Sequence, residues 1–360
     1  KNGLDVLVAE KEPVFGGTTA LSGGYLWVPN NPFSRDAGVD DNKEAALAYI
    51  RHEAGNQFDA DRAEAFLDAG PEMIEFMEKN THVHFEASPA FSDYHPDAPG
   101  GTAGGRSILV KPAKASMLGA DIEKLRPPRQ ELTLFGLAIG SGKELWHFYR
   151  AFKRPESFLY VSRRLAKYGV DKAITGRSQM LTNGNALAAR LYRSARDAGV
   201  EVMLESPLKS LIRADDGKVI GAAMHTPHGM RRVMARKGVV LACGGFPQDI
   251  ARRQSLYKHA SAEGEHVSAA SPGNTGDGLR MAETIGAATL MDYPNAGAWA
   301  PTSLVPRPDG TKGPFPHFID RGKPGVIAVR RNGRRFVNES NSYHDFIQGL
   351  EAATPAGEPA

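Results

Sequence analysis

The chain has 360 residues, of which 41% are hydrophobic and 24% charged, and its 44 Lys+Arg against 41 Asp+Glu leave a formal charge of +3. This composition is typical of a globular protein and excludes a disordered tail or a strongly basic nucleic-acid-binding protein. The single cysteine, Cys243, excludes a disulfide framework. No apolar run approaches the roughly 18 residues of a membrane anchor, so we expect a cytoplasmic protein.

The first predicted element is a short β-strand over residues 4–9, which ends in Glu10 and leads into a glycine-rich segment over residues 15–24. An acidic residue at the end of a strand can bind ribose hydroxyls, and a glycine-lined loop lets backbone amides reach a pyrophosphate. On its own, Glu10 could equally be a solvated carboxylate. A strand, a G-x-G-x-x-G turn and a helix ordinarily come before such a segment, so we expect a fragment of a longer protein.

Helical periodicity follows over residues 42–79, with breaks expected near Gly55 and Gly70. Residues 86–140 are rich in proline and glycine, and a long irregular stretch inside an enzyme favours a binding loop. Residues 145–168 again predict a helix, whose basic side chains we expect to face solvent.

The most sharply defined unit begins with a helix from residue 183 that Gly199 ends, and a strand follows over residues 200–204. The next three segments predict a small antiparallel meander, with strands over residues 209–213, 219–226 and 231–235. Residues 238–242 are entirely apolar and predict a strand buried in a parallel sheet.

The remaining chain is more irregular. A glycine turn over residues 273–278 leads into a predicted helix over residues 279–285. Residues 290–360 predict loops, a hairpin-like segment over 325–336, and a tail without a closing element. His82 and His84 alternate on a possible strand, but two histidines without a third ligand do not predict a metal site, and we expect none.

Five motifs carry a resemblance to a known family. In chain order they are Glu10 with Phe15-Gly16-Gly17-Thr18-Thr19-Ala20-Leu21-Ser22-Gly23-Gly24, then Gly184-Asn185-Ala186-Leu187, Leu241-Ala242-Cys243-Gly244-Gly245-Phe246, Gly273-Asn274-Thr275-Gly276-Asp277-Gly278, and Arg335-Phe336-Val337-Asn338-Glu339. Through them the chain resembles the fumarate reductase/succinate dehydrogenase flavoprotein superfamily. Within it the chain most resembles the 3-ketosteroid Δ1-dehydrogenases, through residues 19–29 and 338–343.

The resemblance implies an α/β fold. It places a Rossmann-like FAD-binding domain over residues 1–290, with a parallel sheet and a small antiparallel meander, and the incomplete start of an α+β substrate (capping) domain over residues 291–360. The cofactor implied is FAD. Its expected contacts are Glu10, Gly16, Gly17, Thr18, Thr19, Ser22, Gly23, Gly24, Leu208, Ala242, Gly244, Gly245, Asn274 and Asp277.

The resemblance also implies a chemistry. In the fumarate reductases the fourth residue after the Arg-Phe-x-Asn-Glu glutamate is an arginine that delivers a proton, whereas here it is Tyr343, as in the steroid dehydrogenases. The expected reaction is therefore the 1,2-desaturation of a 3-ketosteroid-like cyclic ketone. Tyr343 is the expected base for the proton next to the ketone, and N5 of the flavin is the expected hydride acceptor. A phenol is a poor base at neutral pH unless its phenolate is stabilised, and Tyr94 matches the family's supporting tyrosine.

The expected partners are a small hydrophobic, steroid-like ketone and an electron acceptor, with no nucleic acid and no membrane anchor. Two alternatives remain. One keeps the flavin but acts on another substrate, as the fumarate reductases do. The other is a truncated, non-catalytic module of flavoprotein fold, because the family's ketone-polarising tyrosine and glycine belong to a C-terminal segment beyond residue 360.

Overall fold

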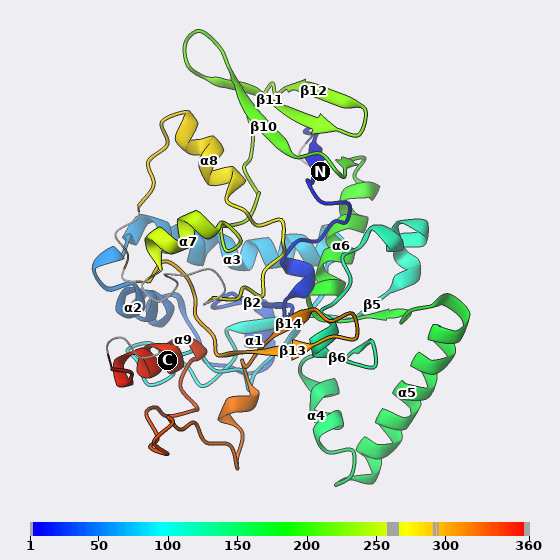
Figure 1. Ribbon diagram of the computed structural model, residues 1–360, viewed down its shortest axis with the longest axis vertical. Helices are drawn as coiled ribbons and strands as arrows, with labels where there is room; N and C mark the ends of the chain where they lie inside the picture. The colour runs from blue at the N-terminus through cyan, green and yellow to red at the C-terminus, as the bar shows by residue number, and fades with distance from the viewer. Residues whose placement is uncertain (1–2, 258–265, 291–292, 294, 356–360) are drawn as a thin grey trace.

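Helices and short sheets alternate along the chain, in a computed structural model that describes residues 3–257, 266–290, 293 and 295–355 (Figure 1). Its helices are α1 Pro32–Asp36, α2 Lys43–Ala54, α3 Ala60–Asn80, α4 Lys143–Tyr149, α5 Pro155–Thr175, α6 Asn183–Asp197, α7 Ile250–Leu256, α8 Asp277–Thr284 and α9 Tyr343–Ala353. Its strands are β1 Leu7–Ala9, β2 Tyr25–Trp27, β3 Phe85–Ala87, β4 Ser107–Val110, β5 Ala113–Lys114, β6 Thr133–Leu134, β7 Leu137–Ala138, β8 Met180–Leu181, β9 Glu201–Met203, β10 Leu208–Arg213, β11 Val219–Thr226, β12 Gly229–Met234, β13 Thr302–Pro306 and β14 Lys312–Pro316.

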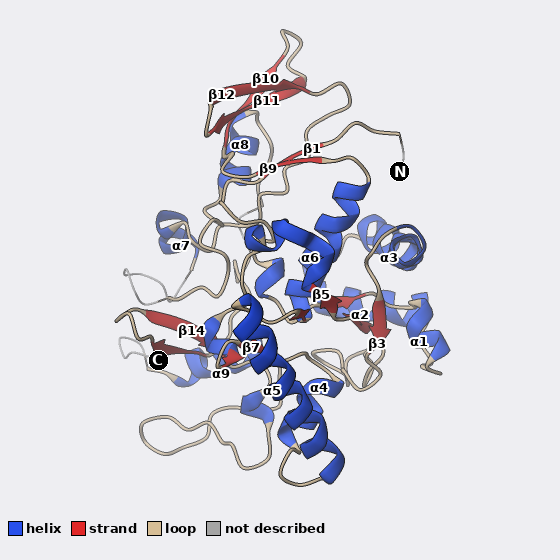
Figure 2. Cartoon of the chain, turned by 90° about the vertical axis from the view of Figure 1, so that its right-hand side faces the viewer, coloured by secondary structure: helices blue, strands red, loops and turns tan. Residues whose placement is uncertain are grey.

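Two of the predicted sheet elements lie at one end of the molecule (Figure 2). Strands β1 and β9 pair in parallel, with Leu7 opposite Glu201 and Ala9 opposite Met203. Strands β10, β11 and β12 form an antiparallel sheet in chain order. These pairings confirm the predicted strand before Glu10 and the predicted meander, and α6 confirms the predicted helix from residue 183. The sequence predicts these elements because each has strong local periodicity and a clear turn signal.

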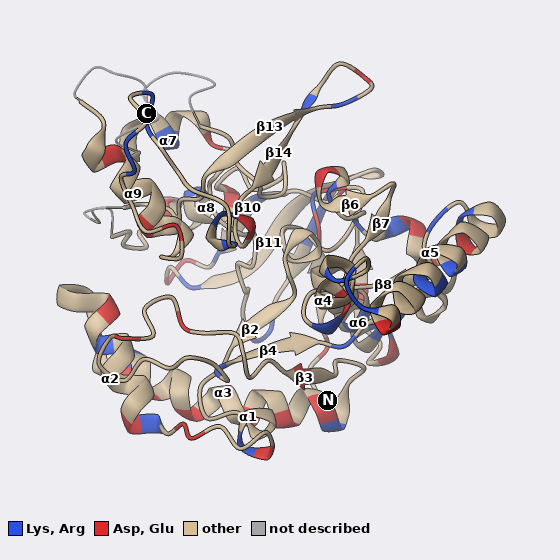
Figure 3. Ribbon diagram, turned by 90° about the horizontal axis from the view of Figure 1, so that it is seen from below, with Lys and Arg blue, Asp and Glu red and all other residues tan. Residues whose placement is uncertain are grey.

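The main hydrophobic core forms around the antiparallel sheet β2-β4-β3. All four residues of β4 are buried, and Ile74 of α3 and Ala186 of α6 are also fully buried in this core. Helices α1, α2 and α3 lie along one side of the sheet (Figure 3). The first glycine-rich segment continues directly into β2, which pairs with β4. The loop between β3 and β4 carries Tyr94 and Arg106.

Polar side chains begin the helices that cover this core. The side chains of Asn31, Asn42 and Asp59 accept hydrogen bonds from backbone amides in the first turns of α1, α2 and α3. Such capping satisfies donors that a helix leaves unpaired at its start. The expected break near Gly55 lies between α2 and α3, as predicted.

The expected break near Gly70 is wrong, because α3 continues through Pro71 to Asn80. A Cβ atom at Gly70 would lie 3.0 Å from Cγ1 of Val28, so the missing side chain lets the helix pack closely against the core. This packing outweighs the low helix propensity of the Gly-Pro pair.

The predicted strand over residues 238–242 is also wrong. The structure gives these residues no strand, and the side chain of Val240 is 90% exposed. A strand requires hydrogen bonds to a neighbour, and no strand in the described part of the chain pairs with this segment.

The last part of the chain contains more regular structure than the sequence predicts. Strands β13 and β14 form a hairpin, whereas the predicted hairpin over 325–336 contains one isolated bridge, between Val329 and Arg335. Helix α9, which Ser342 caps, is also absent from the sequence prediction, and the end of the expected Ala/Pro/Gly tail lies outside the described residues. The expected domain boundary falls at residues 291–292, which lie outside the described residues.

Candidate active site

Two tyrosines from distant parts of the sequence meet at the start of α9. The hydroxyl groups of Tyr94 and Tyr343 share a hydrogen bond, and their rings lie edge to face with centroids 5.3 Å apart. Tyr343 is the first residue of α9, and Tyr94 lies in the long loop between β3 and β4. The structure therefore brings together the two residues that the resemblance predicts as the catalytic pair.

Burial of the Tyr94 hydroxyl, followed by its hydrogen bond to Tyr343, raises the pKa of Tyr94 above its usual value. Tyr94 consequently keeps its proton more firmly than an ordinary phenol does. A protonated Tyr94 donates the shared hydrogen bond to the Tyr343 oxygen, and a hydrogen bond accepted by an oxygen stabilises its deprotonated form.

A short, ordered segment holds Tyr343. The Ser342 side chain accepts a hydrogen bond of 3.2 Å from the Asp345 amide and so caps α9. The Glu339 carboxylate accepts hydrogen bonds from the Arg335 guanidinium and from the Ala328 amide, and these bonds lower the pKa of Glu339 to about 2. Glu339 therefore stays ionised and fixes the turn that precedes the helix.

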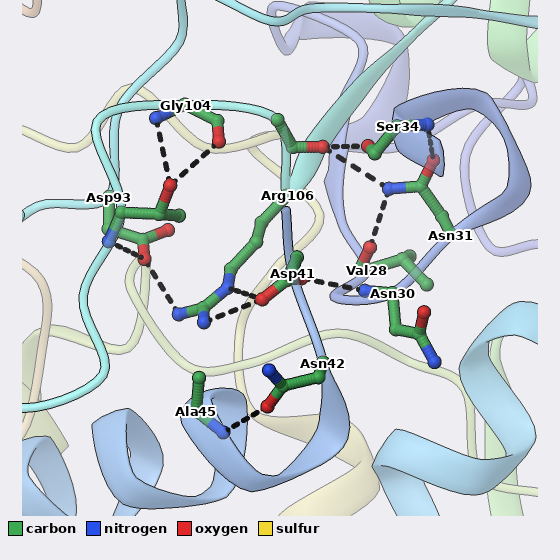
Figure 4. A network of polar contacts seen from close by, with 12 residues as sticks. Val28, Asn30, Asn31, Ser34, Asp41, Asn42, Ala45, Asp93, Gly104 and Arg106 are labelled. Atoms are coloured by element: carbon green, nitrogen blue, oxygen red, sulfur yellow. Dashed lines mark hydrogen bonds and ion pairs between the residues drawn. The ribbon is translucent and has the colours of Figure 1, made fainter. Parts of the chain in front are cut away.

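A buried ionic network holds Tyr94 through the residue before it (Figure 4). The Asp93 carboxylate receives hydrogen bonds from the Arg106 guanidinium at 2.9 Å and from the Trp27 indole at 2.8 Å. The same guanidinium donates two bonds to Asp41, at 2.8 and 3.0 Å. Side-chain exposures of 1%, 1% and 3% for Arg106, Asp93 and Asp41 leave little room for water in this network.

His95 links the Tyr94 loop to α9. Its Nε2 lies 2.7 Å from the Asp345 carboxylate, and its Nδ1 lies 2.8 Å from the Glu53 carboxylate of α2. Burial alone lowers the pKa of His95, but the hydrogen bonds to Asp345 and Glu53 outweigh it and raise the pKa above its usual value. A protonated His95 donates to both carboxylates and ties together the elements on each side of the tyrosine pair.

The expected cofactor residues gather around the glycine turn before α8. The Thr18 hydroxyl oxygen accepts hydrogen bonds of 3.0 Å from the Ser271 amide and from the Asn274 side chain. Partial burial alone raises the pKa of Asp277, but its ion pair of 2.6 Å with Lys11 outweighs burial and lowers that pKa. The structure thus brings the first glycine-rich segment and residues 273–278 into direct contact.

A third stretch completes this surface. The amide of Gly276 donates to the carbonyl of Gly245 at 3.1 Å, and a Cβ atom at Gly244 would lie 3.0 Å from the Asn274 side chain. Burial raises the pKa of Cys243, and the negative charges of Asp277 and Glu10 raise it further, so Glu10 lies within electrostatic reach of this stretch. The exposed cofactor residues on these stretches are Thr18, Thr19, Ser22, Gly23, Ala242, Gly244 and Gly245.

The glycines of the first segment have two different roles. At Gly24, with φ of +76°, a Cβ atom would lie 2.5 Å from the backbone carbonyl carbon of Asn183, so this glycine allows close packing against α6. At Gly17, with φ of +49°, a Cβ atom would meet nothing within 4 Å. Open backbone of this kind fits a dinucleotide whose pyrophosphate approaches backbone amides.

The remaining expected contacts lie at the edges of this surface. Gly16 packs against helix α6, where its Cβ atom would lie 3.3 Å from Ala188. The amide of Ser206 donates to the Glu10 carbonyl at 2.8 Å, and Leu208 begins β10 two residues later. Leu208 is therefore near Glu10 in the fold, while the rest of the meander extends away from α9 (Figure 1).

The sequence motifs do not point to several of the residues around the tyrosine pair. These are Asp41, Glu53, Asp93, His95, Arg106, Arg321 and Asp345. Charged side chains of this kind are usually solvated, so the sequence gives little sign that they cluster. The one local signal is Ser342 followed three residues later by Asp345, which is the pattern of a helix cap.

Neither a membrane span nor a metal centre is found among the residues that the structure describes. None of their helices combines the length and the apolar character needed to cross a membrane. Within the same residues, no group of three or more His, Cys, Asp and Glu side chains is arranged to hold a metal ion.

Several known dehydrogenases are similar to this chain over nearly its whole length. A 4-oxocyclohex-2-ene-1-carboxylate 5-dehydrogenase of Sinomonas cyclohexanicum is 39% identical over 99% of this chain, and a 3-oxosteroid 1-dehydrogenase of Mycobacterium tuberculosis is 36% identical over 95%. The crystal structure of the 3-ketosteroid delta1-dehydrogenase from Sterolibacterium denitrificans in complex with 1,4-androstadiene-3,17-dione matches with a TM-score of 0.85 and 30% identity over 97% of this chain.

The chain spans 60%, 59% and 62% of the lengths of these three proteins. The model of the FAD binding domain family matches residues 1–359. FAD is therefore the cofactor of the fold, and the chain belongs to the FAD binding domain family of flavoproteins.

Proposed function

We propose that this chain forms the flavin-binding part, and half of the catalytic centre, of a dehydrogenase that desaturates a cyclic ketone. The observation that carries the proposal is the hydrogen bond between Tyr94 and Tyr343, because it joins a proton-holding phenol to a second phenol at a helix start. Such a pair is suited to removing a weakly acidic proton from carbon. The dehydrogenase names of the relatives support the same chemistry.

The reaction removes two hydrogens from neighbouring carbon atoms. The carbonyl group acidifies the C–H bond next to it, and the Tyr343 phenolate takes that proton while Tyr94 donates its hydrogen bond to the Tyr343 oxygen. FAD, when bound, supplies the acceptor for the hydride that leaves the adjacent carbon. The electron pair of the broken C–H bond next to the carbonyl becomes a carbon–carbon double bond conjugated with the ketone, and an electron acceptor then reoxidises the flavin.

Different groups of the expected cofactor residues would contact different parts of FAD. Thr18 would lie near the adenine and pyrophosphate side of FAD. Asn274 and Asp277, with the exposed backbone of Gly244 and Gly245, would line its pyrophosphate and ribityl part. Thr19, Ser22, Gly23 and Gly24 would face its ring system. These assignments are supported by the contacts of Thr18 with Asn274 and of Lys11 with Asp277, which unite separated motifs.

The ketone could carry a fused steroid ring system or a single ring with a carboxylate, since the relatives carry names of both kinds. The test is flavin reduction in the complete, flavin-loaded protein without an electron acceptor. A 3-oxo-4-ene steroid, 4-oxocyclohexanecarboxylate and its 2-ene derivative, and succinate are supplied separately. We expect one of the cyclic ketones to bleach the flavin. Bleaching by succinate alone would favour a fumarate reductase-type enzyme, and a protein that binds no flavin would favour a non-catalytic module.

A further inference from the structure

Arg321 lies beside the tyrosine pair and forms no ion pair within the described residues. Its guanidinium carbon lies 5.8 Å from the centroid of the Tyr343 ring. The Nη atoms donate hydrogen bonds to the carbonyls of His317, at 3.1 Å, and of Phe318 and Asn341. These three acceptors are neutral carbonyl groups. The carboxylates of Asp320 and Glu339 pair with His317 and Arg335 instead of with Arg321.

One nitrogen of this side chain is buried and unused. The Nε atom of Arg321 has no hydrogen-bond partner among the described residues. Burial lowers the pKa of Arg321 from its usual value, but an arginine remains protonated at any pH at which proteins are folded. The side chain as a whole is only partly buried, but no carboxylate of the described chain pairs with its charge, so that charge acts on its neighbours.

Carboxylates near the two tyrosines already contact histidine rings. His95 lies between the carboxylates of Glu53 and Asp345, and the Asp320 carboxylate contacts the His317 ring at 2.5 Å. On the Tyr94 side the remaining titratable neighbour is Tyr49, a neutral phenol at physiological pH. Arg321 therefore differs from the other described charged side chains near the two tyrosines. No opposite charge among the described residues contacts it directly.

We propose that Arg321 is a positioning residue that holds the turn before α9 in place and stabilises the negatively charged form of Tyr343. Its hydrogen bond to the Asn341 carbonyl fixes the chain two residues before Tyr343, and its charge faces the ring of that tyrosine. A positive charge near a phenol favours the phenolate over the neutral form. The inference builds on the proposed function but concerns an ionisation that exists without substrate.

The test compares tyrosine ionisation in the complete, flavin-loaded protein. The ultraviolet absorbance change of tyrosinate is titrated with pH in the wild type, and the titration of a Tyr343→Phe variant is subtracted to isolate the pair. We expect Arg321→Gln to move this ionisation upward by about one pH unit or more, since a nearby opposite charge typically shifts a pKa by about 1–3 units. Arg321→Lys keeps the charge and should retain most of the wild-type value.

A matched charge deletion provides the control. Arg163→Gln removes an exposed positive charge from α5 and should leave the ionisation where it is. If substrate turnover is detected, the alkaline rise of kcat/KM should move with the titration in Arg321→Gln. Absence of turnover would count against the proposed function only, because the titration requires no substrate.

An unchanged titration in a folded Arg321→Gln protein would overturn the inference. If the KM of that variant also rises for a carboxylate-bearing ketone but not for a neutral one, Arg321 is a substrate-binding residue instead. If Arg321→Gln does not fold, Arg321→Lys tests the inference, because it keeps the positive charge. An upward shift of about one pH unit or more in the tyrosine titration of Arg321→Lys would then overturn the inference.

Discussion

Arg106 and Arg321 approach the tyrosine pair from different parts of the chain, and they differ in what balances their charge. Two aspartates neutralise Arg106, and all three side chains are buried. Three backbone carbonyls hold Arg321, and none of its hydrogen-bond acceptors in the described chain is a carboxylate. The comparison separates a buried arginine whose charge is neutralised within the network from a partly exposed arginine whose charge has no carboxylate partner in the described chain, and we infer a structural role for the first and an electrostatic role for the second.

The largest expected effect on stability is at Arg106. Arg106→Met leaves the carboxylates of Asp41 and Asp93 buried without an opposite charge, and breaking a buried ion pair in this way typically costs about 3–5 kcal/mol. We expect the free energy of unfolding, measured by denaturant titration, to fall by about that amount. Limited proteolysis should show that the loop over residues 88–106, which carries Tyr94, loosens first.

Two controls define that result. Lys79→Met breaks an exposed i,i+4 pair with Glu75, and such a pair contributes only about 0.3–0.5 kcal/mol. Adding Asp41→Asn and Asp93→Asn to Arg106→Met removes the stranded charges and should restore part of the loss. A loss below about 1 kcal/mol in Arg106→Met would show that the network does not hold the loop.

A smaller effect is expected at Arg321. Arg321→Met removes hydrogen bonds to backbone carbonyls and leaves no carboxylate stranded, so we expect a loss of about 1–2 kcal/mol. The same denaturant titration measures it. A loss as large as that of Arg106→Met would contradict the division of the two arginines into a structural and an electrostatic role.

The smallest effect, and the one that depends on pH, is at His95. Because the fold raises the pKa of His95, protonation of this histidine stabilises the folded state below its unfolded pKa of about 6.5. That contribution is lost as the pH rises through the higher folded pKa. We therefore expect His95→Gln to lower the free energy of unfolding more at about pH 5.5 than at about pH 8.5.

His228→Gln is the control for His95, since His228 is exposed in the turn between β11 and β12 and should show no such difference. A cost of His95→Gln that grows with pH would have the opposite sign to the expected one. It would show that the neutral imidazole, rather than the imidazolium, links Glu53 to Asp345.

Local sequence patterns predict the parts of the fold whose structure depends on neighbours along the chain. The helix from residue 183, the strand after Gly199 and the β10–β12 meander follow from periodicity and turn residues. The predicted strand over 238–242 is wrong because a strand depends on a partner far away in the sequence. The β13–β14 hairpin escapes prediction because Pro306, Pro314 and Pro316 lie within its strands.

The candidate site divides in the same way. Motifs point to Tyr343 and Tyr94, and the structure joins their hydroxyl groups. No motif points to Arg106, His95 or Arg321, because each has a partner more than ten positions away in the sequence. These partners are Asp41, Asp345 and Asn341. Their contacts form only when β4, α2 and α9 come together around the loop that carries Tyr94.

The most direct test of the central claim is single-turnover flavin reduction by a cyclic ketone that bleaches the wild-type protein. We predict that Tyr343→Phe slows this step by about 10²–10⁴-fold, the usual contribution of a general base, while flavin content and ketone affinity stay near the wild type. An unchanged rate of flavin reduction in a folded, flavin-loaded Tyr343→Phe protein would contradict the claim that Tyr343 is the base.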